Sequence, residues 1–184
     1  IFALVFFLLT PFITLYFVAL FSTFLSVLQK PIEKMIIKKA ARKLSIHRGL
    51  KIAIAGSYGK TSMKEILKTV FLDNKKVAAT PDNKNTPLGI SRFVDTLKGD
   101  EEVLIFEMGE YFPGDISELC EIVNPDIGII TGINEAHLDK FGNIEKTTKT
   151  IFELADFLKH KENTKLFVNG DNRIVKERAS QLIN

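Results

Sequence analysis

The sequence contains only one cysteine, Cys120, so an intrachain disulfide is excluded. This scarcity is typical of proteins from a reducing compartment. Cys120 shares a helical spacing with Ile116, Leu119 and Val123, and we expect it to pack in the core. No internal repeat is present, and 184 residues suffice for one domain of ordinary size. Because the chain starts at Ile1 and stops within a helical pattern at Asn184, we interpret it as a fragment that lacks both ends.

Charge is absent from residues 1–28, which consist mostly of Phe, Leu, Ile and Val. About 20 consecutive apolar residues cross the core of a bilayer, so this stretch predicts a transmembrane helix. A cleaved signal peptide has a shorter apolar region and a small-residue cleavage site, and neither is present. The alternative is a buried helix of a soluble protein, for which 28 uncharged residues is long.

Acidic residues are scarce in the next segment, residues 29–50. Between residues 30 and 51 the chain has eight Lys or Arg and a single Glu. By the positive-inside rule, this predicts a protein of the cytoplasmic membrane in which everything after about residue 30 lies in the cytoplasm. Anionic membrane lipid is then a partner, although a solvated linker helix that never contacts lipid is equally compatible. The stretch from Pro31 to Leu50 predicts a basic amphipathic helix, whose apolar side comprises Ile32, Met35, Ile36, Ala40 and Leu44.

The basic segment accounts for the positive charge of the whole chain. The net charge of residues 30–51 is +7, which, set against +3 for all 184 residues, leaves the remainder at −4. A nucleic-acid-binding domain is expected to carry its basic surface on the fold itself. We therefore expect no nucleic acid partner.

From Lys51 onward, residues 51–184 alternate between short apolar runs and helical patterns. Runs such as 103–106 and 127–130 are apolar throughout, as in strands covered by helices on both faces. This predicts an α/β domain, a doubly wound and mainly parallel sheet with a P-loop, preceded by the transmembrane helix. We expect strands at 51–55, 76–79, 103–107, 126–131 and 165–169, and helices at 61–72, 87–98, 115–123, 145–159 and 172–182.

A glycine-containing turn connects the first strand to the first helix of this domain. The general phosphate-binding template is G-x-x-x-x-G-K-[ST], but its first glycine would fall at Ile54, so the chain has a shorter variant. Backbone N–H groups of such a turn bind phosphate oxygens, Lys60 can reach the β- and γ-phosphates, and the Thr61 hydroxyl can ligate Mg²⁺. An ordinary strand–turn–helix with a surface lysine is the alternative. The predicted nucleotide-binding residues are Gly56, Ser57, Tyr58, Gly59, Lys60, Thr61 and Ser62.

Three further features follow predicted strands. Glu107 closes the strand at 103–107 and can hold Mg²⁺ directly or through water, or it is simply a surface residue. His137 lies in the loop after the strand at 126–131, where a lone histidine is more often structural. Residues 80–89 form a polar, turn-rich loop that ordinary loop chemistry also explains.

Taken together, these motifs make the chain resemble the central ATP-binding domain of the Mur ligase family, and most of all its members that add D-alanyl-D-alanine to UDP-MurNAc-tripeptide. The motifs occur in family order over about 120 residues, and the ordered series is far more specific than any one of them. The matching segments are 56–62, 83–89, 107–110 with 113–115, 136–139 with 141–142, and 169–172.

The resemblance implies roles for individual residues. Lys60, Glu107 and His137 are implied to be catalytic, with ATP and Mg²⁺ as cofactors. Thr61 and Glu107 would hold one Mg²⁺, and His137 would help to hold a second. Asn83 and Asn85 would lie near the γ-phosphate and the substrate, and Asn169 and Asp171 near the nucleotide.

The resemblance also implies a reaction, the ATP-dependent formation of an amide. A substrate carboxylate attacks the γ-phosphate to form an acyl phosphate, and an amine then displaces phosphate. The implied substrates are UDP-MurNAc-peptide and D-Ala-D-Ala or a similar amine.

The chain departs from the family pattern in several ways. Many members have a carbamylated lysine, a ligand of the second Mg²⁺, where this chain has Ile151, which we expect in the core. Gly132 stands where the family usually has asparagine. The usual UDP-binding and C-terminal domains are missing, so the chain alone should bind ATP without turnover.

These departures leave other functions open. One is a non-catalytic, membrane-tethered ATP-binding scaffold. Others are a ligase similar to folylpolyglutamate synthase, and a membrane-linked motor or signalling NTPase, which the lack of a usual Walker B aspartate disfavours.

Overall fold

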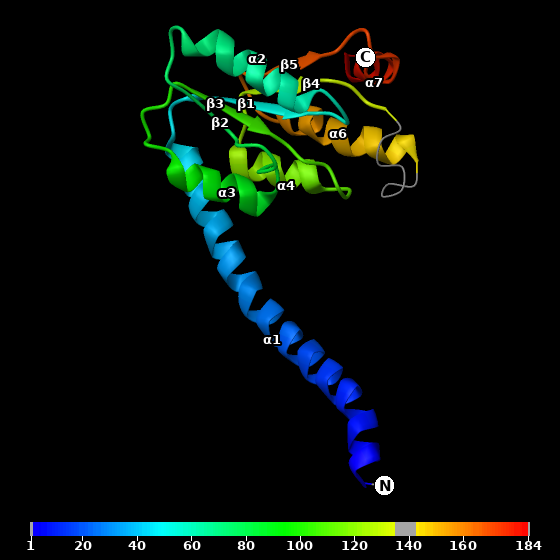
Figure 1. Cartoon of the computed structure of the whole chain (residues 1–184). Helices are drawn as coiled ribbons and strands as arrows, with labels where there is room; N and C mark the ends of the chain where they lie inside the picture. Colours follow the sequence, from blue (N-terminus) through cyan, green and yellow to red (C-terminus); the bar gives the residue numbers. More distant parts are fainter. Residues whose placement is uncertain (1, 135–142, 184) are drawn as a thin grey trace. The chain divides into compact units, whose positions relative to one another are not determined.

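The computed structural model of the protein describes residues 2–134 and 143–183 (Figure 1). It divides into two compact units, Ile1–Ile36 and Ile37–Asn184. Helix α1, Phe2–Ile46, passes through Pro11 and Pro31 and belongs to both units. Every residue from 7 to 30 is exposed, and the best 18-residue window of the helix has a mean hydropathy of 2.0. By length and composition this is a helix able to cross a membrane; the same test is passed by signal sequences and by core helices of soluble proteins.

The second unit is built on a five-stranded sheet in the order β2-β3-β1-β4-β5, and all four strand pairs are parallel. The chain adds β2 and β3 on one side of β1, and β4 and β5 on the other. The carboxyl end of β1 is therefore the topological switch point, where open α/β sheets bind ligands. The strands are β1 Leu50–Ala55, β2 Val77–Ala79, β3 Val103–Glu107, β4 Ile127–Ile130 and β5 Lys165–Val168.

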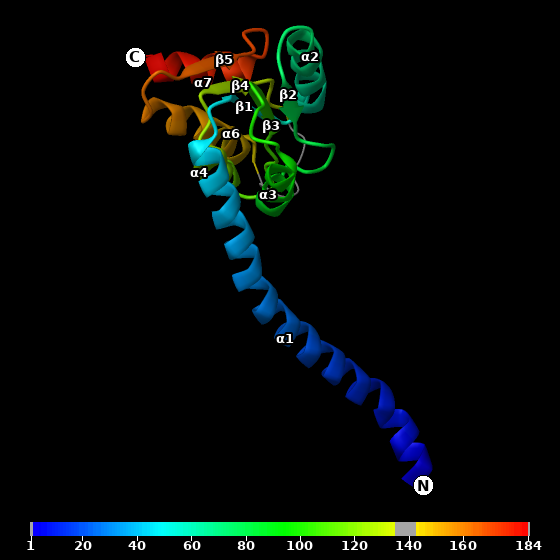
Figure 2. The same ribbon diagram turned by 90° about the vertical axis from the view of Figure 1, so that its left-hand side faces the viewer.

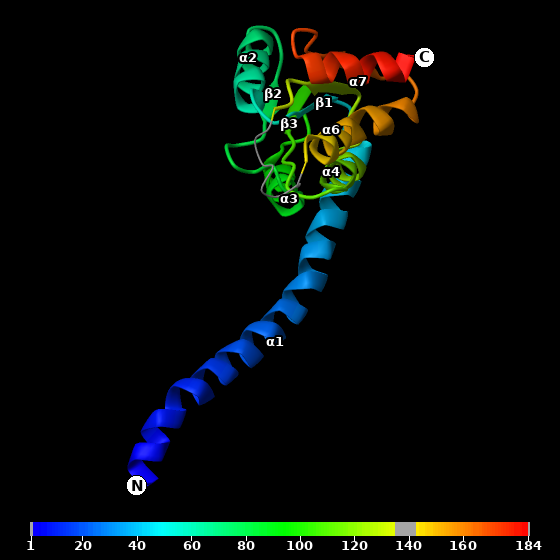
Figure 3. The ribbon, with the colours of Figure 1, turned by 90° about the vertical axis from the view of Figure 1, so that its right-hand side faces the viewer.

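Helices cover both faces of this sheet. Helix α2 lies over one face, and α3, α4 and α6 lie over the other (Figures 1 and 3). Helix α7 contacts β5 at the edge of the sheet (Figure 2). Apolar side chains form one core cluster between the sheet and α3, α4 and α6, and a second beneath α2. The helices are α2 Lys60–Leu72, α3 Pro87–Thr96, α4 Asp115–Val123, α6 Ile144–Lys159 and α7 Arg173–Ile183.

Local sequence explains where several helices begin and end. The Thr86 hydroxyl accepts a hydrogen bond from the Gly89 N–H, and Pro87 occupies the first helical position of α3. The Asn143 side chain caps α6 in the same way, by accepting from the Lys146 N–H at 2.9 Å. Asn124 ends α4 in the left-handed conformation, with φ 50°.

The predicted α/β fold is confirmed, and each expected strand and helix of residues 51–184 is present within about two residues of its bounds. Cys120 is fully buried, as expected, and burial raises the pKa of its thiol to about 12. The segment from Pro31, expected to be helical to Leu50, is helical as far as Ile46, where it forms the last part of α1, and β1 begins at Leu50. Of its expected apolar side, Ala40 and Leu44 are buried in the core cluster, whereas Ile32 and Met35 are exposed.

A buried polar pair connects the end of α1 to the loop before β3. The His47 Nε2 atom lies 3.1 Å from the Glu101 carboxylate, and His47 Nδ1 accepts from the Gly49 N–H, so the ring proton resides on Nε2. Burial, the largest single influence, acts to raise the pKa of Glu101. Hydrogen bonds from the backbone N–H groups of Lys98 and Gly99 and from His47 outweigh it and lower this pKa from 4.5 to about 2.

We expect Glu101 to make the stability of the domain sensitive to acid. A carboxylate with a depressed pKa in the folded state stabilises it above the unfolded-state pKa and loses this effect as pH falls from about 4.5 to about 2. The shift corresponds to about 3 kcal/mol. In urea unfolding followed by circular dichroism, Glu101→Gln should lower stability at neutral pH and flatten its decline in this window. The exposed Glu118→Gln should behave as wild type, and equal acid dependence of the wild type and Glu101→Gln would contradict the assignment.

Candidate functional site

The loop from Gly56 to Gly59 leaves the carboxyl end of β1 and leads into α2. Gly56 has φ 142° and Gly59 has φ 77°, conformations that favour glycine. A Cβ on Gly56 would lie 2.3 Å from Thr131 Oγ1 and 2.9 Å from the Gly132 carbonyl oxygen. The loop is therefore closely fitted against the segment that follows β4, and only glycine at position 56 permits that approach.

Beyond this loop lies a cavity of about 260 Å³, next to the N-terminus of α2. The backbone N–H groups at the start of a helix and the partial positive charge of its dipole favour anions. Ser57 Oγ is buried and has no hydrogen-bond partner among the described residues, so a polar donor or acceptor in the cavity would satisfy it. The residues that line the cavity are Ser57, Tyr58, Gly59, Lys60, Thr61, Ser62, Asn85, Glu107, Gly109, Glu110 and Tyr111.

Lys60, the first residue of α2, directs its amine into this cavity. The amine donates to the Gly56 carbonyl oxygen and to both carboxylate oxygens of Glu110, the latter two at 3.0 Å. The exposed fraction is 12% for the Lys60 side chain and 1% for that of Glu110. The cation of the phosphate-binding loop is thus held by a buried carboxylate.

Thr61 and Glu107 meet on the same side of the cavity. Ile54 of β1 pairs with Glu107 of β3, so the register brings Glu107 next to the start of the loop. The Thr61 hydroxyl donates to Glu107 Oε2 at 3.0 Å, and the Glu107 N–H donates to the Thr80 hydroxyl. A hydroxyl and a carboxylate are hard oxygen ligands of the kind that Mg²⁺ prefers, so this pair is suited to hold one such ion.

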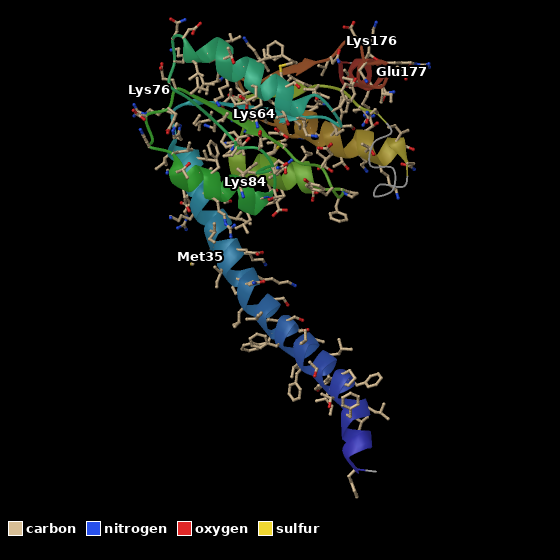
Figure 4. The ribbon with its side chains drawn as sticks, viewed as in Figure 1. Met35, Lys64, Lys76, Lys84, Lys176 and Glu177 are labelled. Carbon is tan, nitrogen blue, oxygen red and sulfur yellow. The ribbon has the colours of Figure 1, made fainter. Side chains whose placement is uncertain are left out.

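Behind Glu107, Lys64 projects from the side of α2 that faces the sheet and is buried (Figure 4). Its amine lies 2.8 Å from Asp82 Oδ1 and 3.3 Å from Glu107 Oε2. Burial, the largest single influence, lowers the pKa of Lys64, but the hydrogen bond to Asp82 and the charge of Glu107 outweigh it and raise this pKa above its ordinary value. Glu107 therefore shares the Lys64 cation with Asp82.

The two asparagines of the loop at 80–89 differ in position. Asn85 lines the cavity, where its carbonyl oxygen accepts from the Gly109 N–H at 2.9 Å and its side chain accepts from the Tyr111 hydroxyl. Asn83 is exposed, with φ 61°, and is outside the described residues that line the cavity.

Tyr58 explains why the chain has Gly132 where the family usually has asparagine. A Cβ at Gly132 would lie 2.4 Å from the Tyr58 ring. The Tyr58 hydroxyl accepts from the Asn172 side chain at 3.1 Å, and the Tyr58 carbonyl oxygen accepts from the Thr131 hydroxyl at 2.5 Å. The tyrosine ring thus occupies the space that a larger side chain at 132 would need.

The segment after β5 lies beside a second cavity, which Asn169 lines together with Tyr58, Gly59 and Ser62. The Asn169 side chain donates to the Thr131 carbonyl oxygen at 2.8 Å and accepts from the Asp171 N–H at 3.0 Å. Asn169 is therefore adjacent to the loop, whereas Asp171 is exposed.

His137 lies outside the described residues, which end at 134 and resume at 143. On α6, Ile151 is fully buried in the core, as expected. Glu153 accepts hydrogen bonds from the Gly114 and Ser117 N–H groups, at 2.8 and 3.0 Å, and so caps the N-terminus of α4. Within residues 2–134 and 143–183, no group of three His, Cys, Asp or Glu side chains is arranged to hold a metal ion.

Glu110, Lys64 and Asp82 were missed as site residues by the sequence analysis. Glu110 belongs to the motif segment 107–110, and its position three residues after Glu107 was the only sequence feature that could have indicated a role in the site. Lys64 is one helical turn beyond Lys60, a spacing that places both amines on the same side of α2.

Fold and site together define an α/β domain with a glycine loop and a lysine suited to bind phosphate. Comparison with known proteins identifies the family, since residues 54–184 match the model of the Mur ligase middle domain. The chain belongs to the Mur ligase family, as its sequence motifs predicted.

Curated relatives of the chain include UDP-N-acetylmuramoyl-tripeptide–D-alanyl-D-alanine ligases. That of Rickettsia prowazekii is 37% identical over 133 residues, which cover 72% of this chain and 29% of the relative. That of Bacillus subtilis is 30% identical over 129 residues, which cover 70% of this chain and 28% of the relative. The chain thus spans less than a third of the length of these relatives.

Solved structures agree with this assignment. The MurF ligase of Thermotoga maritima, crystallised in complex with ADP, has a TM-score of 0.74 and 33% identity. The match covers 81% of this chain and 34% of that ligase. A MurF structure from Acinetobacter baumannii, matched over 80% of this chain and 32% of its own, has a TM-score of 0.75 at 23% identity and supports the fold alone.

Proposed function

We propose that this chain is the ATP-binding part of an enzyme that joins UDP-MurNAc-tripeptide to D-Ala-D-Ala through an amide bond. The observation that carries the proposal is the cavity at the end of β1, where Lys60, Thr61 and Glu107 converge, in a chain of this family. The ADP complex of the Thermotoga maritima relative supports the same ligand for this domain. The chain covers only part of those relatives. The complete reaction is therefore inferred from the sequence similarity to them.

Within this proposal, each described residue has a physical task. The N–H groups at the start of α2 and the Lys60 amine bind the β- and γ-phosphates. Thr61 and Glu107 would hold one Mg²⁺, which would supply positive charge that neutralises the phosphates. Asn85, which lines the cavity, would contact the γ-phosphate or the substrate, and Asn169 would lie near the nucleotide. The roles of Asn83, Asp171 and His137 stay hypotheses from the family resemblance.

The chemistry follows from the poor reactivity of a carboxylate as an acyl donor. The carboxylate of the peptide attacks the γ-phosphorus, and ADP leaves with the electrons of the broken P–O bond. The amine of D-Ala-D-Ala then adds to the acyl phosphate, and phosphate departs as the amide forms. Lys60 stabilises the charge that develops on the transferred phosphoryl group.

A substrate-dependence assay on the complete protein tests this function. Phosphate release should require ATP, UDP-MurNAc-tripeptide and D-Ala-D-Ala together, and omission of any one should reduce it to background. Steady ATP hydrolysis without either substrate would contradict the proposal and favour an NTPase. Activity with a folate and glutamate in their place would favour the folate ligase alternative.

A second candidate function, a non-catalytic ATP-binding scaffold, is favoured by Ile151. Many family members have at the aligned position a carbamylated lysine that holds a second Mg²⁺. In this chain that position is Ile151, whose side chain is fully buried in the core cluster. Phosphate release by the complete wild-type protein, supplied with ATP and both substrates, distinguishes the two functions. A scaffold would bind ATP and release no phosphate, whereas a ligase would release it.

We also propose that residues 2–28 anchor the protein in the cytoplasmic membrane with the α/β domain in the cytoplasm. The support is the exposed apolar helix and the basic residues that follow it. Wild-type protein should remain in the membrane fraction after alkaline carbonate extraction, and deletion of residues 2–28 should move most of it to the soluble fraction. Equal partitioning of the two forms would contradict the anchor.

A further inference from the structure

The cavity proposed to bind nucleotide phosphates is poor in positive charge. Among the described residues that line it, Lys60 is the only cation, whereas Glu107 and Glu110 are carboxylates. The nearby Lys64 amine is in contact with Glu107 and Asp82. A nucleotide phosphate chain entering this cavity therefore encounters like charge, which low-dielectric surroundings make more costly than in water.

The two carboxylates differ in how their charge is balanced. Glu107 is paired with Lys64, and it also accepts a hydrogen bond from the Thr61 hydroxyl. Lys64 lies outside the cavity lining, so its contact with Glu107 can persist when a ligand binds. Glu110 instead pairs with Lys60, the cation that the phosphates themselves need.

The Lys60 amine has three N–H donors, and the structure shows three acceptors for it. Two of these are the oxygens of Glu110, which present an anion to the lysine much as a phosphate group would. A phosphate oxygen can therefore bind Lys60 only by replacing one of these acceptors, and two of the three belong to Glu110. The displaced carboxylate has 1% of its side chain exposed and remains beside the phosphates.

We propose that Glu110 occupies Lys60 in the empty site and thereby makes nucleotide binding depend on a divalent cation. This inference rests on the proposed function, since it assumes that phosphates bind beside Lys60. When Mg²⁺ accompanies the nucleotide, its charge compensates for the displaced carboxylate. Without Mg²⁺, Glu110 competes with the phosphates for Lys60 and repels them, so the free nucleotide is rejected.

Equilibrium binding of ADP to the 184-residue chain in detergent tests this, by titration calorimetry in excess Mg²⁺ and in EDTA. Wild type should bind ADP about 100-fold more weakly in EDTA, and Glu110→Gln should tighten the binding in EDTA by about tenfold. The neutral Glu110→Ala should act in the same direction, which excludes a new contact from the introduced amide. Glu110→Asp keeps the charge and should stay close to wild type.

Glu118→Gln is the matched control, because Glu118 is exposed on α4 outside the cavity lining. Its ratio of affinities with and without Mg²⁺ should equal that of wild type. If wild type binds ADP and the two neutral variants leave this ratio unchanged, the role of Glu110 is refuted and the proposed function stands. If wild type binds no ADP in either condition, the proposed function is refuted and this inference fails with it.

Discussion

Replacing Lys60 with alanine should reduce the affinity for Mg²⁺-ADP by at least about 100-fold, close to 3 kcal/mol. Two effects add in the same direction. The variant loses the amine that binds the phosphates, and it leaves the Glu110 carboxylate buried without its counter-ion. Removal of one member of a buried ion pair also lowers the stability of the fold, typically by about 3 kcal/mol or more. Titration calorimetry and chemical denaturation measure the two losses separately.

A double substitution separates the two effects. Lys60→Ala combined with Glu110→Gln removes the buried charge, so stability should largely recover while nucleotide binding stays weak. Lys176→Ala is the matched control, because Lys176 is exposed on α7 (Figure 4) and its removal should change neither property. Wild-type affinity in Lys60→Ala would contradict a role for this lysine in phosphate binding.

Replacing Gly56 with alanine should have the largest effect on the architecture of the site. The new Cβ would lie 2.3 Å from Thr131 Oγ1 and 2.9 Å from the Gly132 carbonyl oxygen, and φ at this position is 142°. Strained backbone and steric overlap together should cost about 3 kcal/mol or more, with loss of nucleotide binding as the loop shifts. Thermal unfolding and ADP titration are the two measurements.

Substitutions at two other glycines of the chain separate the cost of backbone strain from the cost of steric overlap. Gly99 has φ 93°, but a Cβ at this position would have no atom within 4 Å, so Gly99→Ala measures backbone strain alone and should cost about 1 kcal/mol. Gly170 has neither a positive φ nor a close neighbour, so Gly170→Ala should be nearly neutral. A Gly56→Ala variant no less stable than Gly99→Ala would show that the loop is not closely packed.

The sequence allowed the α/β architecture to be predicted because each strand and helix of the domain has its own local signal. Strands such as β3 are short apolar runs, and α3 and α6 start at recognisable caps. The glycine loop between β1 and α2 was predicted for the same reason, since its glycines, lysine and threonine lie close together in the sequence. The burial of Ile151 followed from the apolar stripe of α6.

The contacts that define the site are not local, and this is why several of them were missed. Lys60 and Glu110 are 50 residues apart and meet because β1 and β3 pair in a particular register. Tyr58 and Asn172 are 114 residues apart, and the Tyr58 ring held by this contact accounts for Gly132. Composition and spacing carry no information on such pairs. The ion pair between Lys60 and Glu110 therefore became visible only in the folded chain.

We propose that the loop before α2 binds the phosphates of a nucleotide, while Thr61 and Glu107 hold its metal. A crystal structure with a non-hydrolysable ATP analogue and Mn²⁺, whose anomalous scattering locates the metal, tests it most directly. We expect a phosphate oxygen within hydrogen-bond distance of the Lys60 amine. The Mn²⁺ peak should lie between Thr61 Oγ1 and the Glu107 carboxylate. A metal or phosphate bound elsewhere on the domain, with Lys60 still paired to Glu110, would contradict it.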